Sequence, residues 1–181
     1  LFRSEAGWKH FLNNGMLEVS AYYKTRRNVV ALRPEVFVED GQWGEYIMVG
    51  KGDSYGARMY FYKDWKRWKL QLSYTYARTR EWFPELAANG KMPSLYDIPH
   101  QLNAALSYQL NARSLFSVGG MMRSGKVIDL DENFDPLPAS EFRQHRLPMN
   151  YRIDVGYSYR KAFGEKLLSL RFGLYNVLGN P

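Results

Sequence analysis

Three histidines and a group of carboxylates are the residues whose types could perform chemistry in this chain. The histidines, His10, His100 and His145, are far apart in the sequence. Only His145 has acidic neighbours in its own expected loop, between Asp129 and Asp135. These residues include the donors of a metal site, but charged side chains in loops are usually solvated. We therefore expect neither a metal site nor a cofactor.

Two short motifs resemble catalytic or nucleotide-binding motifs but lack the necessary context. Ser124 and Gly125 are not placed in the strand–turn–helix of a nucleophile elbow. Residues 50–54 read Gly-Lys-Gly-Asp-Ser, without the spacing or the following helix of a phosphate-binding loop. The chain has no cysteine, which excludes disulfides and thiolate metal ligands. These observations predict a protein that is not an enzyme.

A group of polar residues, rich in arginine, occupies one face of the expected strands. On this face the residues would line a wide lumen and guide a solute, or they would form ion pairs with one another. Mutual pairing is the favoured interpretation, because charged residues inside proteins are usually paired. The group consists of Arg58, Arg123, Arg152, Asp154 and Arg171.

A group of aromatic residues lies in or near the expected loops. Their rings could stack on a substrate, because aromatic side chains offer large flat surfaces. They could equally pack the loops together, and the sequence leaves both options open. The group consists of Trp82, Phe83, Tyr96, Phe134 and Phe142.

The elements that position these residues show a period of two. From Trp68 to Tyr76, aromatic and aliphatic residues alternate with Lys, Gln, Ser and Thr. Such alternation separates the two faces of a strand, whereas a helix would scatter the residues around its circumference. Similar patterns predict about eight strands. They lie near residues 4–12, 16–31, 45–63, 67–82, 99–110, 114–128, 147–160 and 165–178.

The strands and their connections have the proportions of a membrane barrel. Several strands exceed the mean of about 5–6 residues for globular proteins and reach the roughly 9–11 that a membrane strand needs. Short turns near residues 13–15, 64–66, 111–113 and 161–164 alternate with long segments near 32–44, 83–98 and 129–146. Short periplasmic turns and long external loops are typical of outer-membrane barrels. We expect an all-β fold, an antiparallel transmembrane segment of a larger barrel.

Composition narrows the alternatives. Aromatic residues make up 16% of the 181, and the net charge of +7 is scattered along the chain, which argues against nucleic-acid binding. No apolar run approaches the roughly 20 residues of a membrane helix. A soluble sandwich or lipocalin-like barrel would also alternate. The charged second face and the strand length favour the membrane barrel.

Six segments resemble, in order, local patterns of one family. They are residues 52–58, 72–76, 96–103, 123–125, 146–155 and 175–181. Together, residues 46–181 resemble the C-terminal part of the barrel of TonB-dependent outer-membrane transporters, particularly those of Bacteroidetes. The resemblance implies that residues 1–181 belong to a barrel of about 22 strands. It also implies that the plug domain, the TonB box and a last strand lie outside this chain.

The resemblance further implies a function in the bacterial cell outer membrane. That function is energy-coupled import of a scarce nutrient, such as a siderophore, cobalamin, a glycan or a peptide. The implied partners are outer-membrane lipid, the TonB complex acting through the plug, the nutrient itself and, as a further option, a surface lipoprotein. The alternatives are a passive porin or adhesin-like barrel, and a soluble β-barrel that binds a ligand.

Overall fold

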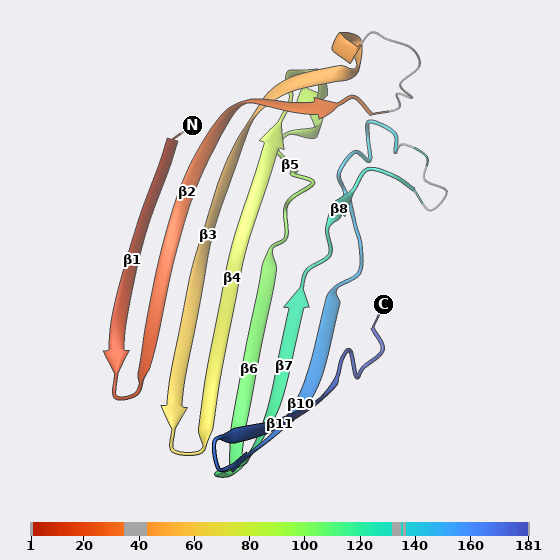
Figure 1. The fold of residues 1–181 in the computed structure, drawn as a ribbon. Helices are drawn as coiled ribbons and strands as arrows, with labels where there is room; N and C mark the ends of the chain where they lie inside the picture. Colours follow the sequence, from red (N-terminus) through yellow and green to blue (C-terminus); the bar gives the residue numbers. More distant parts are fainter. Residues whose placement is uncertain (1, 35–42, 132–134, 136, 181) are drawn as a thin grey trace.

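The computed structural model describes residues 2–34, 43–131, 135 and 137–180, and its main feature is one antiparallel sheet (Figure 1). Eight long strands follow one another in chain order across the sheet, so each strand pairs with its neighbours in sequence. They are β1 (Phe2–Leu12), β2 (Gly15–Leu32), β3 (Ile47–Trp65), β4 (Trp68–Trp82), β6 (His100–Asn111), β7 (Ser114–Arg123), β10 (Asn150–Phe163) and β11 (Lys166–Leu174). The predicted all-β fold is confirmed.

The two ends of the sheet differ in the length of their connections. Two-residue turns join the strands at one end, and long segments join them at the other (Figure 1). We call these the turn end and the loop end. The loop end contains the short helices η1 (Trp43–Tyr46) and η2 (Pro84–Asn89), the strand β5 (Met92–Pro93) beside β4, and the pair β8 (Val127–Ile128) and β9 (His145–Arg146).

The register of the sheet separates its two faces. Partner residues on neighbouring strands point to the same side of a sheet. One row of partners is almost entirely apolar or aromatic and consists of Trp8, Val19, Met59, Tyr74, Leu102, Met122 and Tyr151. The adjacent row is polar and consists of Gly7, Ser20, Arg58, Thr75, Gln101, Arg123 and Asn150. We call these sides the apolar face and the polar face.

Protein does not cover the apolar face in the described part of the chain. Side chains on this face, such as Phe172 and Leu174, are 64% and 67% exposed. The buried hydrophobic residues lie instead at the loop end. A sheet that leaves its apolar face open suits contact with lipid, because a soluble sheet would bury that face.

One bulge changes the faces of β2. The pairing with β3 shifts between Arg27 and Val29, and Asn28 has a φ of 57°. Arg27 pairs with Lys51 and shares the apolar face, whereas Val29 pairs with Gly50 and turns to the polar face. An uninterrupted strand over residues 16–31, as the sequence suggests, would place both on one side.

Three predicted strands end elsewhere in the structure. The strand expected over 114–128 ends at Arg123, that over 147–160 runs from Asn150 to Phe163, and that over 165–178 ends at Leu174. The first two shift because residues 124–126 and 146–148 leave the sheet together. A Cβ on Gly125 would lie only 1.5 Å from the carbonyl oxygen of Leu147. Glycine is needed where two backbones approach this closely.

Candidate functional site at the loop end

A small hydrophobic cluster attaches the loops to the sheet. Its buried members are Met48, Phe83, Met92 and Phe142. The ring of Phe83 packs directly on β3, since a Cβ on Gly50 would lie 2.6 Å from its Cδ1 atom. Phe83 is fully buried and Phe142 is 4% exposed. Both rings therefore pack the loops against the sheet.

Glu81 is the centre of a buried ionic cluster beside these rings. Its carboxylate accepts hydrogen bonds from Arg26 Nη2 at 2.9 Å, from Ser94 Oγ at 2.9 Å and from Arg143 Nη1. The Arg143 guanidinium also lies over the rings of Phe83 and Phe142, at 5.4 and 5.0 Å from their centroids. The cluster joins β2, β4 and the 124–149 loop.

Asp129 completes this cluster and is electrostatically the least favourable member. Its Oδ2 atom is 3.6 Å from Arg143 Nε, beyond hydrogen-bond distance. Burial raises the pKa of Asp129, and this effect outweighs the opposing influence of Arg143. Three buried atoms of the cluster have no hydrogen-bond partner among the described residues, namely Asp129 Oδ1, Arg26 Nε and Arg143 Nε.

A second ionic cluster surrounds Asp97. The Asp97 carboxylate contacts the guanidinium of Arg146, accepts the backbone N–H of Thr79 at 2.6 Å and lies 3.4 Å from Arg78 Nη1. Arg146 also donates to the Asp97 carbonyl oxygen at 2.8 Å. Asp97 and Arg146 belong to two of the six segments that resemble the transporter family, so the fold brings these segments into contact.

A hollow of about 460 Å³ opens between the end of β2 and the loops. Its size and its largely apolar lining are those of a small-molecule site. The polar atoms at its wall come from the Glu81 cluster, and its apolar lining includes Leu95 and Leu130. Tyr96 also lines the hollow and is 84% exposed, so its ring is open to a ligand. Of the other aromatic candidates, Trp82 lies on the apolar face beside Lys51, and Phe134 is outside the described residues.

The five polar candidates all lie on the polar face, as the register requires. Arg152 and Asp154 form an ion pair of 3.0 Å. Arg58, Arg123 and Arg171 have no carboxylate within 4.0 Å in the described part of the chain, so mutual pairing accounts for only two of the five residues. Arg58 lines a second hollow of about 380 Å³ on this face, together with Lys24 and the Arg3–Glu5 ion pair. The polar face is therefore basic.

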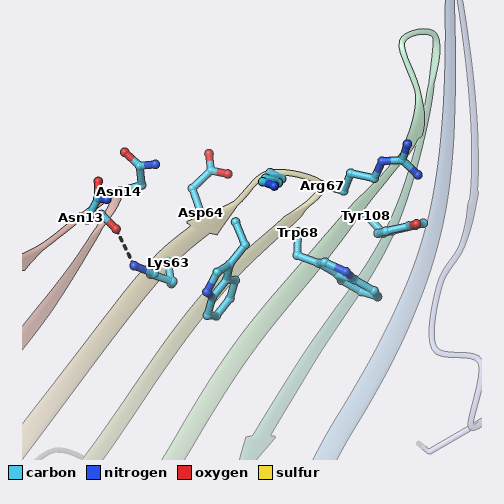
Figure 2. Close-up of a pocket in the computed structure, with 9 residues that line it drawn as sticks. Asn13, Asn14, Lys63, Asp64, Arg67, Trp68 and Tyr108 are labelled. Atoms are coloured by element: carbon cyan, nitrogen blue, oxygen red, sulfur yellow. Dashed lines mark hydrogen bonds between the residues drawn. The ribbon is translucent and has the colours of Figure 1, made fainter.

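The turn end of the apolar face carries aromatic and basic residues (Figure 2). The ring centroids of Trp68 and Tyr108 are 4.3 Å apart, and Trp65 is the partner of Trp68 across the turn. Lys63 donates to the backbone oxygen of Asn13 in the neighbouring turn (Figure 2). Tyr and Trp favour membrane–water interfaces, where one end of the side chain is dry and the other wet. This pattern is that of an aromatic girdle.

Within the described ranges, no three His, Asp or Glu side chains are grouped so that they could hold a metal ion. His145, the candidate metal ligand, instead lies 3.1 Å from Glu141. Over the same residues, no helix has the length and apolar character to cross a membrane.

Comparison with known proteins agrees with this geometry. Residues 4–177 match the family described as TonB dependent receptor-like, beta-barrel. The chain belongs to this family. Its fold also matches the crystal structure of BauA, the ferric preacinetobactin receptor from Acinetobacter baumannii, with a TM-score of 0.70 and 16% identity. The match covers 98% of this chain and 25% of that receptor, so the chain spans about a quarter of the receptor's length. No curated protein matches the sequence.

Membership of the TonB-dependent receptor family explains why the sheet has one apolar and one polar face. The family comprises transport receptors of the bacterial outer membrane, not enzymes. In such a barrel the apolar face contacts lipid and the polar face lines the lumen. The glycines and the two ionic clusters at the loop end were not recognised as site residues from the sequence. The signal for them in the sequence was the presence of Gly125, Asp97 and Arg146 in segments that resemble the family.

Proposed function

We propose that the protein imports a scarce nutrient across the bacterial outer membrane by TonB-dependent, energy-coupled transport. The observation that carries the proposal is the family match over residues 4–177, on a sheet with one apolar, uncovered face and one basic face. In this proposal residues 1–181 form a C-terminal part of the barrel wall. The loop end faces outside the cell, and the TonB complex acts through a plug encoded elsewhere in the gene.

The loop-end hollow is the proposed first contact for the nutrient. It offers the exposed Tyr96 ring, apolar walls and the partly exposed guanidinium group of Arg26. A ligand with flat or apolar parts and acceptor oxygens would complement this lining. A ferric siderophore is the first class to test, because the structural relative is a ferric preacinetobactin receptor. Cobalamin, a glycan and a peptide remain the other classes, and a surface lipoprotein remains a further partner to test.

The decisive experiment compares uptake with and without the energy source. A strain that lacks the gene for this chain is supplied with radiolabelled ferric siderophores, cobalamin, glycans or peptides, and uptake is measured with and without a functional TonB. We expect one class to enter only when both the full-length gene product and TonB are present. Uptake that persists without TonB would favour the passive-porin alternative and contradict the proposal.

A further inference from the structure

Basic side chains gather on the apolar face at the loop end of the strands, at the end opposite the aromatic girdle. Arg27 and Lys51 are partners in the register of β2 and β3. Asp53 lies two residues after Lys51, on the same face, and its partner on β4 is Arg80. Lys91 joins them from the loop through a 2.6 Å contact between its Nζ and Asp53 Oδ1. We call Arg27, Lys51, Arg80 and Lys91 the outward basic patch.

Among the described residues, the positive charge of the patch exceeds the negative charge beside it. Asp53 pairs with Lys91. Arg27, Lys51 and Arg80 are exposed, and in the described part of the chain none has a carboxylate within 4.0 Å. The patch therefore has a formal excess of three positive charges. Tyr23, Thr25 and Trp82 border it around a hollow of about 420 Å³, which adds hydroxyl groups and a ring.

The height of the patch matches the level of lipid headgroups. A strand rises about 3.4 Å per residue, and barrel strands tilt by about 35–45°. The twelve residue steps from Trp68 at the turn end to Arg80 therefore span roughly 30 Å along the membrane normal. The apolar band of a barrel is about 25 Å tall. If Trp68 marks one interface, Arg80 lies just beyond the other, where the headgroups of the outer leaflet are located.

We propose that the outward basic patch binds the phosphate groups of a phosphorylated lipid in the outer leaflet. The acyl chains of the same lipid would lie on the apolar rows below, such as the row of Tyr74 and Leu102. A lipid fits this surface better than a free anion, because the patch lies on the same face of the sheet as the apolar rows. Each Lys or Arg near an anionic membrane surface adds to the attraction for such a headgroup.

The test removes three charges that have no carboxylate partner among the described residues. Full-length receptor in detergent is titrated with diphosphoryl lipid A, and bound lipid is counted by native mass spectrometry. The R27Q/K51Q/R80Q variant should bind about 100-fold more weakly, at a few-fold to tenfold per charge. The matched control, K66Q/R67Q/R113Q, removes the same charge at the turn end and should bind like the wild type. If the triple variant does not fold, K51Q alone should bind about fivefold more weakly.

Two further arms identify the chemistry that is recognised. Lipid A stripped of its phosphates should bind far more weakly to the wild-type receptor than the diphosphoryl form. Millimolar inorganic phosphate should leave the bound lipid in place. Equal binding by the triple variant and the wild type, equal binding of the two lipids, or displacement by inorganic phosphate would each overturn the proposal. None of these readouts depends on nutrient uptake, so the proposal can fail independently of the transport function.

Discussion

The guanidinium of Arg26 on β2 reaches the carboxylate of Glu81 on β4 across the whole width of β3, with 2.9 Å between Nη2 and Oε1. Gly52 is the register partner of both residues and lies between them. A Cβ at Gly52 would be 3.3 Å from Arg26 Nη2 and 3.3 Å from Glu81 Cγ. The glycine therefore provides the space in which the two side chains meet.

Replacing this glycine should weaken the ion pair. In Gly52→Ala the new Cβ would also lie 3.0 Å from the Arg80 carbonyl oxygen, which is backbone and yields little. We expect the local stability of the loop end to fall by about 1–2 kcal/mol, which is within the usual cost of overpacking. The amides of the 124–149 loop should then exchange hydrogen faster. Gly119→Ala is the matched control, because nothing lies within 4 Å of its Cβ position. Equal exchange in the two variants would contradict the role of Gly52.

Removing the charge of Glu81 should have a larger effect. Glu81→Gln would leave the buried guanidinium of Arg143 without its principal carboxylate partner, and breaking a buried pair costs about 3–5 kcal/mol. The loop should then open and become sensitive to added protease on intact cells. Glu141→Gln, in the same loop but at an exposed residue whose ion pair is with the exposed His145, should leave the cleavage rate unchanged. A protease-resistant loop in Glu81→Gln would exclude Glu81 as its anchor.

The packing of this loop should depend on pH through Asp129. Because burial raises the pKa of Asp129, the neutral form is favoured in the packed loop. The stability that the neutral Asp129 side chain adds to the packed loop is complete below the ordinary aspartate pKa. This stability is lost as the pH rises through the raised pKa of Asp129. Protection factors for the loop amides should therefore fall over that interval. In Asp129→Asn this fall should disappear, whereas Asp135→Asn, an exposed residue nearby, should retain it.

The two faces of the sheet should respond differently to a new charge. Leu72→Arg places a cation in the middle of the apolar face and should cost roughly 2–4 kcal/mol of barrel stability. Gln71→Arg, one residue away on the polar face, should be tolerated. The stability of both variants can be measured by gel electrophoresis, as the temperature at which the folded barrel shifts to the mobility of the unfolded chain. A Leu72→Arg protein that remained folded in water without detergent would contradict the lipid-facing assignment.

Tyr96 should contribute to nutrient capture if the loop-end hollow is the first contact. Loss of an aromatic contact costs about 0.5–1.5 kcal/mol, so Tyr96→Ala should weaken binding of the transported ligand by roughly two- to tenfold. Tyr175→Ala removes an equally exposed ring outside this hollow and is the control. Unchanged binding in Tyr96→Ala would locate the ligand contact elsewhere.

The sequence determined the strands, their faces and the asymmetry of the connections. These features follow from local rules: a period of two separates the Leu72 side from the Gln71 side without knowledge of any partner strand. The same alternation in the sequence places five polar residues on one face, namely Arg58, Arg123, Arg152, Asp154 and Arg171. The resemblance of residues 46–181 to the barrel of TonB-dependent transporters is confirmed at the level of the family by the match over residues 4–177.

Only the tertiary structure decided how the loop end is built. The bulge at Asn28 depends on a single left-handed residue and reverses the faces beyond it. The Glu81 cluster unites Arg26, Asp129 and Arg143, which are far apart in the chain, and no local pattern links them. Likewise, Phe83 and Tyr96 look alike as loop aromatics, but one is buried and the other exposed. Burial and pairing depend on which segments meet in space, and alternation within one strand carries no information about that.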